Sequence, residues 1–180
     1  MGMEQIAASL ERVASVLRRK PQAAVADDSA ATARWDGGLR TSVRADNSSD
    51  TGFSVATDMP AELGGEARAL TPGWLLRAGL ASCSATRIAM AAAAEGITLQ
   101  TLEVRATSRS DARGMLAIPD LDGREVPAGP LVMALHVRIG APGVPEARLR
   151  SLVASTATCS PVTDAVERPV AVALHVDVVA

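Results

Sequence analysis

The sequence has very few aromatic residues and a single lysine. Aromatic side chains make up 2% of its 180 residues, with two tryptophans, one phenylalanine and no tyrosine. Single-stranded nucleic acids are bound by basic surfaces that also carry stacking rings, so we expect no nucleic-acid partner. Apolar residues still make up 48% of the chain, chiefly as alanine, valine and leucine. Because such small side chains each bury little area, we expect a dimer interface to add to the core.

The sequence also lacks an uninterrupted apolar run of the kind that crosses a membrane. The most apolar stretch, residues 74–94, is mostly alanine and contains Arg77 and Arg87. Glu4 and Glu11 interrupt the N-terminal segment, which therefore lacks the pattern of a secretory leader. We predict a cytoplasmic protein with no membrane partner.

Apolar periodicity predicts helices and strands that are segregated along the chain. The predicted helices cover residues 3–20, 72–95 and 145–158. Strands are predicted within 34–59, around a turn at 46–50, and over 98–109, 131–139 and 169–179, with a long loop at 110–130. This order indicates the α+β class. We predict an N-terminal helix and linker over residues 1–33, followed by one domain over residues 34–180.

The two cysteines are the first candidates for chemistry. Cys83 lies in the long predicted helix that starts at Thr71-Pro72 and ends at Gly96, and Cys159 follows the next helix. Two thiols are the minimum for dithiol–disulfide chemistry, with one thiol to attack and one to resolve. If the two do not meet, they are small core residues, because free cysteine is among the most buried residue types. The spacing alone leaves both interpretations open.

A thiolate at Cys83 needs a nearby cation. Cys83 lies too far into its helix for the N-terminal dipole to stabilise a negative charge. Arg87 is one turn further on the same face, and an arginine from the early strands is the other candidate. Cys159 lies near a helix C-terminus, where the dipole disfavours a thiolate, so it suits a resolving thiol better.

Other chemistries have weaker support in the sequence. His136 and His175 each lie on the polar side of a predicted strand and lack further ligands at metal-binding spacing. A cysteine–histidine hydrolase would use one of them as its base, but neither lies near a strand end or a turn. The sequence has no phosphate-binding glycine loop, dinucleotide fingerprint or serine nucleophile elbow. We therefore predict no cofactor and no metal.

Three segments of the chain together resemble the OsmC/Ohr family of osmotically inducible and organic hydroperoxide resistance proteins. They are residues 60–65 (PAELGG), 71–83 (TPGWLLRAGLASC) and 92–97 (AAAEGI). Residues 159–162 (CSPV) and 168–172 (RPVAV) are similar to the second cysteine motif and terminal strand of that family. The resemblance covers residues from roughly 34 to 180 and leaves the first helix outside.

The resemblance implies an intertwined homodimer with antiparallel sheets around long central helices that carry the attacking cysteine. It also implies a thiol-dependent peroxidase that reduces organic hydroperoxides. Cys83 would attack the peroxide, Cys159 would resolve the sulfenic acid, and a dithiol would restore both thiols. The arginine of the family's site corresponds best to Arg44, with Arg40 in reserve.

Two positions depart from the family pattern. Gly73 stands where the family usually has glutamate after the helix-starting proline, and the family's Cys-Pro-Val is here Cys-Ser-Pro-Val. The missing carboxylate would otherwise orient the arginine, so Arg87 is a further candidate for the cation. The alternative function is a dimeric protein of this fold that binds a small ligand without peroxidase activity.

Overall fold

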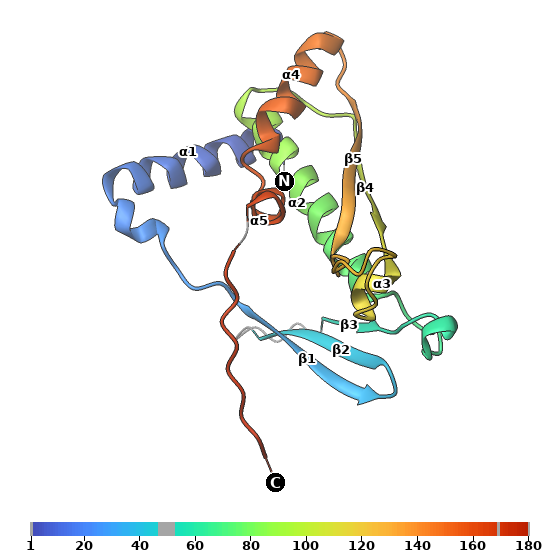
Figure 1. The fold of residues 1–180 in the computed structure, drawn as a ribbon. Coiled ribbons are helices and arrows are strands. Elements are labelled where there is room, and N and C mark those ends of the chain that lie inside the picture. The colour runs from blue at the N-terminus through green and yellow to red at the C-terminus, as the bar shows by residue number, and fades with distance from the viewer. Residues whose placement is uncertain (1, 47–52, 169, 180) are drawn as a thin grey trace.

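The computed structural model describes residues 2–46, 53–168 and 170–179. In these residues, five α-helices accompany a three-stranded sheet and a two-stranded sheet, both antiparallel. Helices and strands are segregated along the chain, which confirms the predicted α+β class. Figure 1 shows the long helix α2 at the centre, with the two-stranded sheet along one side of it.

The N-terminal helix α1 (Met3–Arg19) begins and ends close to its predicted bounds. Gly2 caps it, and the Gly2 N–H donates a hydrogen bond to Gln5 Oε1 at 3.2 Å. The helix stops before the short 3-10 turn η1 (Pro21–Ala24), because proline cannot continue the backbone hydrogen bonds. α1 packs against α2 of its own chain, but Val13 and Val16 on α1 remain exposed.

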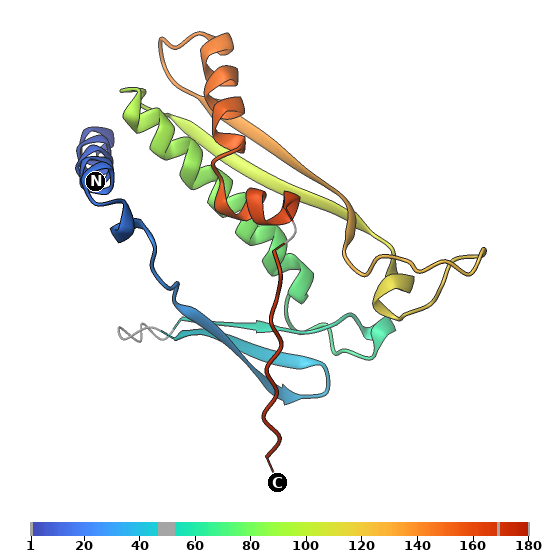
Figure 2. The ribbon, with the colours of Figure 1, turned by 60° about the vertical axis from the view of Figure 1, so that its left-hand side comes forward.

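The first sheet contains β1 (Ala30–Gly37), β2 (Arg40–Asp46) and β3 (Ser54–Thr57), in that order. β1 begins earlier than predicted, because residues 30–35 pair with residues 41–46 of β2. The predicted turn at 46–50 lies outside the described residues except for Asp46. Figures 1 and 2 both show this sheet beyond the N-terminal end of α2 rather than along its length.

The central helix α2 (Pro72–Ala94) starts and stops where the sequence predicts. Thr71 is its N-cap, and Pro72 occupies the first helical position. At the other end, the Gly96 N–H bonds to Ala93 O at 3.1 Å and the Ile97 N–H to Ala92 O at 2.8 Å. This pair of hydrogen bonds is a Schellman motif, which needs a left-handed residue, and Gly96 supplies it with a φ of 67°.

The second sheet is a hairpin of β4 (Thr101–Ser110) and β5 (Pro130–Gly140). Its register pairs Val104 with Val137 and Leu102 with Ile139, so these apolar side chains share one face. The connection between the strands contains one short helix, α3 (Ala112–Met115). Both strands and the long intervening loop agree with the prediction.

The core forms where α2 meets the second sheet and the helix α4 (Glu146–Ala157). Its buried members are Ile88, Ala92, Ile97, Leu149 and Leu152. The apolar face of β4 and β5 packs against this cluster, whereas polar side chains such as Glu103 and Arg138 occupy the other face. The half of α2 that follows Cys83 is therefore firmly held.

A short helix, α5 (Pro161–Glu167), follows α4 and was not predicted. Its seven residues are too few to show a helical apolar period. Ser160 is the N-cap and Pro161 the first helical residue, so the local start signal was present. α5 packs against α2, which brings the segment after Cys159 beside the central helix.

The prediction of a strand over residues 169–179 is wrong for the single chain. Residues 170–179 pair with no strand of the described chain, and Val172, Leu174 and Val178 are 92%, 86% and 91% exposed. The alternating pattern is typical of a strand, but a strand exists only where another strand accepts its hydrogen bonds. Figure 1 shows the segment running from α5 past the three-stranded sheet.

Candidate functional site

Cys83 lies near the middle of α2 and is half-buried. Leu80 and Ser84, on either side of it in the sequence, are buried, and the Ser84 hydroxyl donates to Leu80 O at 2.8 Å. The helix therefore fixes the position of the Cys83 backbone, while the residue stays partly exposed. Both cysteines are free thiols.

The residue that contacts the Cys83 sulfur is Ser160. Its Oγ donates a hydrogen bond to Cys83 Sγ at 3.4 Å, and Ser160 is 1% exposed. The backbone holds it there, because Ser160 caps α5 and the Asp164 N–H bonds to Ser160 O at 2.9 Å. Ser160 was not among the site residues predicted from the sequence. The sequence feature that could have indicated Ser160 is its position directly before Pro161, where the family motif has its second cysteine.

Cys159 lies next to Ser160 but on the outside of the same turn. It is exposed, and its Sγ lies 3.9 Å from the hydroxyl of Thr158. Its backbone N–H bonds to Thr156 O at 3.1 Å, which continues the end of α4. The fold therefore brings the neighbour of Cys159 into contact with Cys83. The expected pairing of the two cysteines remains a prediction.

The polar contacts found for the three candidate arginines are with groups other than Cys83. The Arg44 side chain, on β2, is 69% exposed, with its Nε 3.7 Å from Asp46 Oδ1. Arg87 Nη1 lies 3.6 Å from the Met90 sulfur, and its buried Nε has no partner among the residues described. The positive charge of Arg40 helps to lower the pKa of the Asp58 carboxyl. In the described part of the chain, the hydrogen bonds and ion pairs of these arginines do not include Cys83.

Gly73 has an arginine beside it. A side-chain carbon at Gly73 would lie 3.7 Å from Arg77 Nη1 and 3.9 Å from Thr71 Oγ1, which are ordinary contact distances. Arg77 Nη1 also donates to Ser108 Oγ at 3.2 Å, joining the start of α2 to β4. Arg77 is therefore the cation nearest to the position where the family has its glutamate. In the sequence, Arg77 stands out only as a charge within an apolar stretch.

Asp58 organises the loop that leads into α2. The carboxylate is fully buried and accepts backbone N–H bonds from Arg68 at 3.0 Å, Met59 at 2.8 Å and Glu66 at 3.3 Å. The bond from Arg68 is the main cause that lowers the pKa of the Asp58 carboxyl below its ordinary value. Burial opposes that shift, whereas the bonds from Met59 and Glu66 and the charge of Arg40 add to it.

The same loop depends on a glycine at position 65. A Cβ at Gly65 would lie 1.8 Å from Met59 O, so any other residue would force the loop apart. The loop contains the short 3-10 turn η2 (Ala61–Leu63), and the Asp58 N–H bonds to Leu70 O at 3.1 Å. These contacts close the loop and fix the start of α2.

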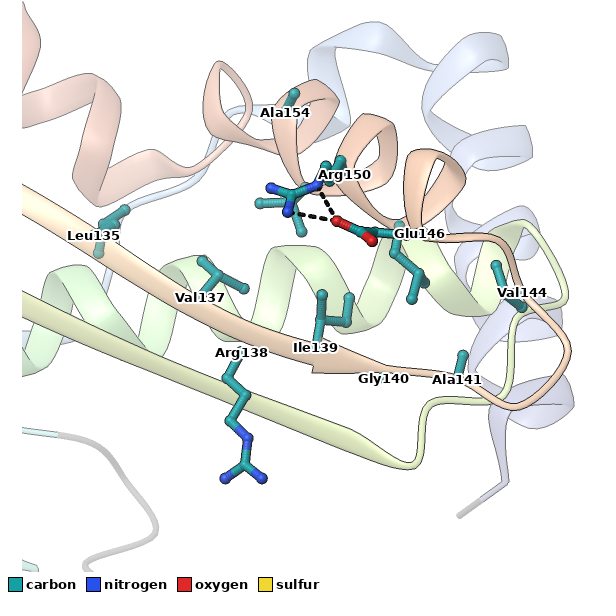
Figure 3. A pocket seen from close by; sticks show the side chains of 12 residues that line it. Leu135, Val137, Arg138, Ile139, Gly140, Ala141, Val144, Glu146, Arg150 and Ala154 are labelled. Atoms are coloured by element: carbon teal, nitrogen blue, oxygen red, sulfur yellow. Dashed lines mark hydrogen bonds and ion pairs between the residues drawn. The ribbon is translucent and has the colours of Figure 1, made fainter.

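Two apolar pockets lie on the helical side of the second sheet. The larger, about 710 Å³, lies between β5 and α4. Figure 3 shows Val137 and Ile139 pointing toward α4 and Arg138 pointing away, with the Glu146–Arg150 ion pair at the rim. The smaller, about 530 Å³, lies between α2, β5 and α5.

The smaller pocket is lined by residues about one helical turn from Cys83 and Ser160. They are Leu80, three residues before Cys83, and Thr163, three residues after Ser160, whereas Cys83 and Ser160 themselves do not line it. The Thr163 hydroxyl is buried and has no hydrogen-bond partner among the described residues. Apart from Thr163 and Glu167, the residues that line this pocket are apolar, which suits the organic part of a small molecule.

The histidines lie away from these features. His136 is on β5 in register with Arg105 of β4, on the polar face of the hairpin. His175 lies in the exposed C-terminal segment. Within residues 2–46, 53–168 and 170–179, no three His, Cys, Asp or Glu side chains group as metal ligands. In the same residues no helix combines the length and apolarity needed to span a bilayer.

Comparison with known proteins identifies the family. The family model described as OsmC-like protein matches residues 64–175, more than half of the chain. The chain therefore belongs to the OsmC-like family, which confirms the resemblance predicted from the sequence. Among curated proteins, none matches the sequence significantly.

Solved structures support the same fold. An organic hydroperoxide resistance protein OsmC from Legionella pneumophila is 26% identical, with a TM-score of 0.58 over 79% of this chain and 90% of the other. An OsmC-like protein from Mycoplasma pneumoniae is 20% identical, with a TM-score of 0.60 over 79% and 89%. The organic hydroperoxide resistance protein OhrB of Bacillus subtilis is 18% identical, with a TM-score of 0.51 over 79% and 93%.

Proposed function

We propose that this protein is a thiol-dependent peroxidase that reduces organic hydroperoxides at Cys83. The observation that carries the proposal is the half-buried Cys83 sulfur, held by a rigid helix and accepting a hydrogen bond from Ser160 at 3.4 Å. The nearby apolar pocket of about 530 Å³ has the size and lining for the organic part of such a substrate. Family membership and the names of the similar structures point the same way.

The first step oxidises Cys83. Its thiolate attacks the terminal oxygen of the hydroperoxide, so that an S–O bond forms and the O–O bond breaks. The organic fragment leaves as an alkoxide and takes up a proton to become the alcohol. Cys83 is left as a sulfenic acid, and the peroxide has gained the two electrons that the sulfur lost.

The second step uses Cys159 as the resolving thiol. Its sulfur attacks the sulfenic sulfur of Cys83, an S–S bond forms, the S–O bond breaks, and water leaves. Cys159 is exposed and adjacent to Ser160, so a local change in the turn between α4 and α5 would bring it to Cys83. An external dithiol then reduces the disulfide and is itself oxidised. Such a cycle requires a reducing compartment, which favours the cytoplasm.

The proposal includes a homodimer that completes the site. Arg44 is our candidate for the cation that stabilises the thiolate and the departing alkoxide. In one chain it lies on the three-stranded sheet beyond the start of α2, paired with Asp46. Assembly of two chains would bring such a sheet against the α2 helices. The side of α2 around Gly79 has open space for that approach, since no atom lies within 4 Å of an added Cβ.

The test is the rate of peroxide consumption by the reduced protein with a small dithiol. We expect cumene hydroperoxide to be consumed faster than hydrogen peroxide, because the organic substrate also gains apolar contacts. The Cys83→Ser variant should fall to the uncatalysed rate. Arg44→Gln should be much slower than Arg87→Gln, which serves as the matched control. Turnover that survives Cys83→Ser would contradict the proposal.

Binding of a small ligand without peroxidase activity is the second candidate function. Two observations favour it. Gly73 stands where the family usually has a glutamate, and neither cysteine lines the larger apolar pocket. This candidate predicts that both thiols stay free after exposure to hydroperoxide. The peroxide assay therefore separates it from the first.

A further inference from the structure

The buried hydroxyl of Ser160 has a sulfur atom as its partner. Ser160 Oγ lies 3.4 Å from Cys83 Sγ although the two residues are 77 positions apart in sequence. A hydroxyl can donate to a thiolate, and a hydrogen bond to the charged form of an acid favours that form. The contact is therefore suited to the reactive state of Cys83.

Backbone contacts fix the place of Ser160 in the turn between α4 and α5. Pro161 at the first position of α5 limits the backbone, and the Asp164 N–H holds Ser160 O at 2.9 Å. On the other side, Cys159 N–H bonds to Thr156 O at 3.1 Å, and Thr156 is itself buried. Ser160 is thus placed by hydrogen bonds on both sides of the turn.

Cys159 and Ser160 face different environments although they are neighbours. Cys159 is exposed, whereas Ser160 is 1% exposed and contacts Cys83. The residue directly before Pro161 is the one that reaches the attacking thiol, and in this chain that residue is serine. The insertion of serine between cysteine and proline therefore changes which side chain meets Cys83.

We infer that Ser160 is a positioning residue that orients the Cys83 sulfur and stabilises its thiolate by donating a hydrogen bond. This inference rests on the proposed function of Cys83 as the attacking thiol. It adds that Ser160, rather than Cys159, occupies the place beside Cys83 in the reduced protein. Formation of the Cys83–Cys159 disulfide then requires the turn to release Ser160.

The first experiment measures how the alkylation of Cys83 by iodoacetamide depends on pH, in a Cys159→Ser background with one thiol. Adding Ser160→Ala should move the alkylation profile to higher pH and slow alkylation at neutral pH roughly tenfold. Ser84→Ala is the matched control, since Ser84 is a buried serine next to Cys83 that bonds to Leu80 O instead. An equal pH profile for Ser160→Ala and the control would overturn the inference.

A second experiment exchanges the two neighbouring residues. In the double variant Cys159→Ser/Ser160→Cys, the thiol next to Pro161 is placed beside Cys83. After cumene hydroperoxide oxidises Cys83, dimedone should trap at least tenfold less of the sulfenic acid in this variant than in the unaltered protein, because the resolving thiol already lies beside it. Trapping compares only the steps after oxidation, so the loss of the Ser160 hydroxyl does not affect it. Equal or greater trapping would overturn the inference.

The alkylation assay involves no peroxide, so it separates this inference from the proposed function. A shifted pH profile without peroxide consumption would support the role of Ser160 and contradict peroxidase activity. Peroxide consumption with an unshifted pH profile would support peroxidase activity and overturn the role of Ser160.

Discussion

At the scale of single residues, the site depends on one polar contact in an apolar setting. The Cys83 sulfur accepts a hydrogen bond from the hydroxyl of Ser160, and the contacts found for Arg44 and Arg87 in the same chain do not include that sulfur. The sequence predicted the helix that holds Cys83, because that helix has clear start and stop signals. It could not identify Ser160 as the partner, because contacts between distant residues depend on how α5 packs against α2.

Gly73 provides a prediction at this scale. Replacing Gly73 by glutamate should stabilise the protein by roughly 1 kcal/mol, because a helical glycine is removed and a carboxylate is added in the first turn. The space permits it, since the nearest atoms to the new Cβ are Arg77 Nη1 at 3.7 Å and Thr71 Oγ1 at 3.9 Å. Urea unfolding measures the effect.

The same variant should also reduce cumene hydroperoxide faster than Gly73→Gln, which has the same shape without the charge. The physical reason is that a carboxylate can pair with an arginine and hold it at the site. Equal turnover in the two variants would show that the missing carboxylate has no bearing on catalysis.

At the scale of elements, the sequence predicted the helices better than the last strand. The Thr71-Pro72 start and the Gly96 stop of α2 are local signals, and both are confirmed. The alternation over residues 170–179 is equally clear, but this segment is extended and exposed in the single chain. A helix forms its hydrogen bonds within itself, whereas a strand needs a partner that its own sequence does not specify.

The loop between β3 and α2 gives a prediction at this scale. The Asp58→Asn change should lower the melting temperature at neutral pH, because an amide accepts the backbone N–H bonds of Arg68, Met59 and Glu66 less well than a carboxylate. Glu62→Gln, an exposed change in the same loop, is the control.

The effect of Asp58 should depend on pH with a definite sign. Its pKa in the folded protein is lowered from the ordinary value of 3.8, so its contribution to stability is fully present above that value. It is lost as the pH falls through the lower folded-state pKa. The stability difference between the unaltered protein and Asp58→Asn should therefore shrink below pH 3.8, and a difference that grows there would contradict this account.

At the scale of the whole molecule, one chain leaves much apolar surface uncovered. The C-terminal segment exposes Val170, Val172, Leu174, Val176 and Val178, and the first sheet exposes Trp35 and Val55. Exposed apolar area of this extent marks a surface for association. The composition had already indicated a dimer, but the sequence could not show which surfaces remain uncovered.

We predict a homodimer in which the C-terminal segment is a paired strand. Light scattering should give twice the 18.5 kDa chain mass. Val172→Lys/Val176→Lys should weaken the dimer, because lysines on the apolar face of a strand oppose its burial. Ala171→Lys/His175→Lys places the same substitutions on the other face and is the control. A concentration-independent monomer mass for the unaltered protein would contradict the prediction.

The most direct test of the central claim is the stoichiometry of thiol oxidation in the reduced protein without added reductant. One equivalent of cumene hydroperoxide should remove both free thiols of each chain and release one equivalent of cumyl alcohol. Cys83→Ser should keep its remaining thiol and release no alcohol. If both thiols of the unaltered protein stay free while the hydroperoxide persists, Cys83 is not a peroxidatic thiol and the account is wrong.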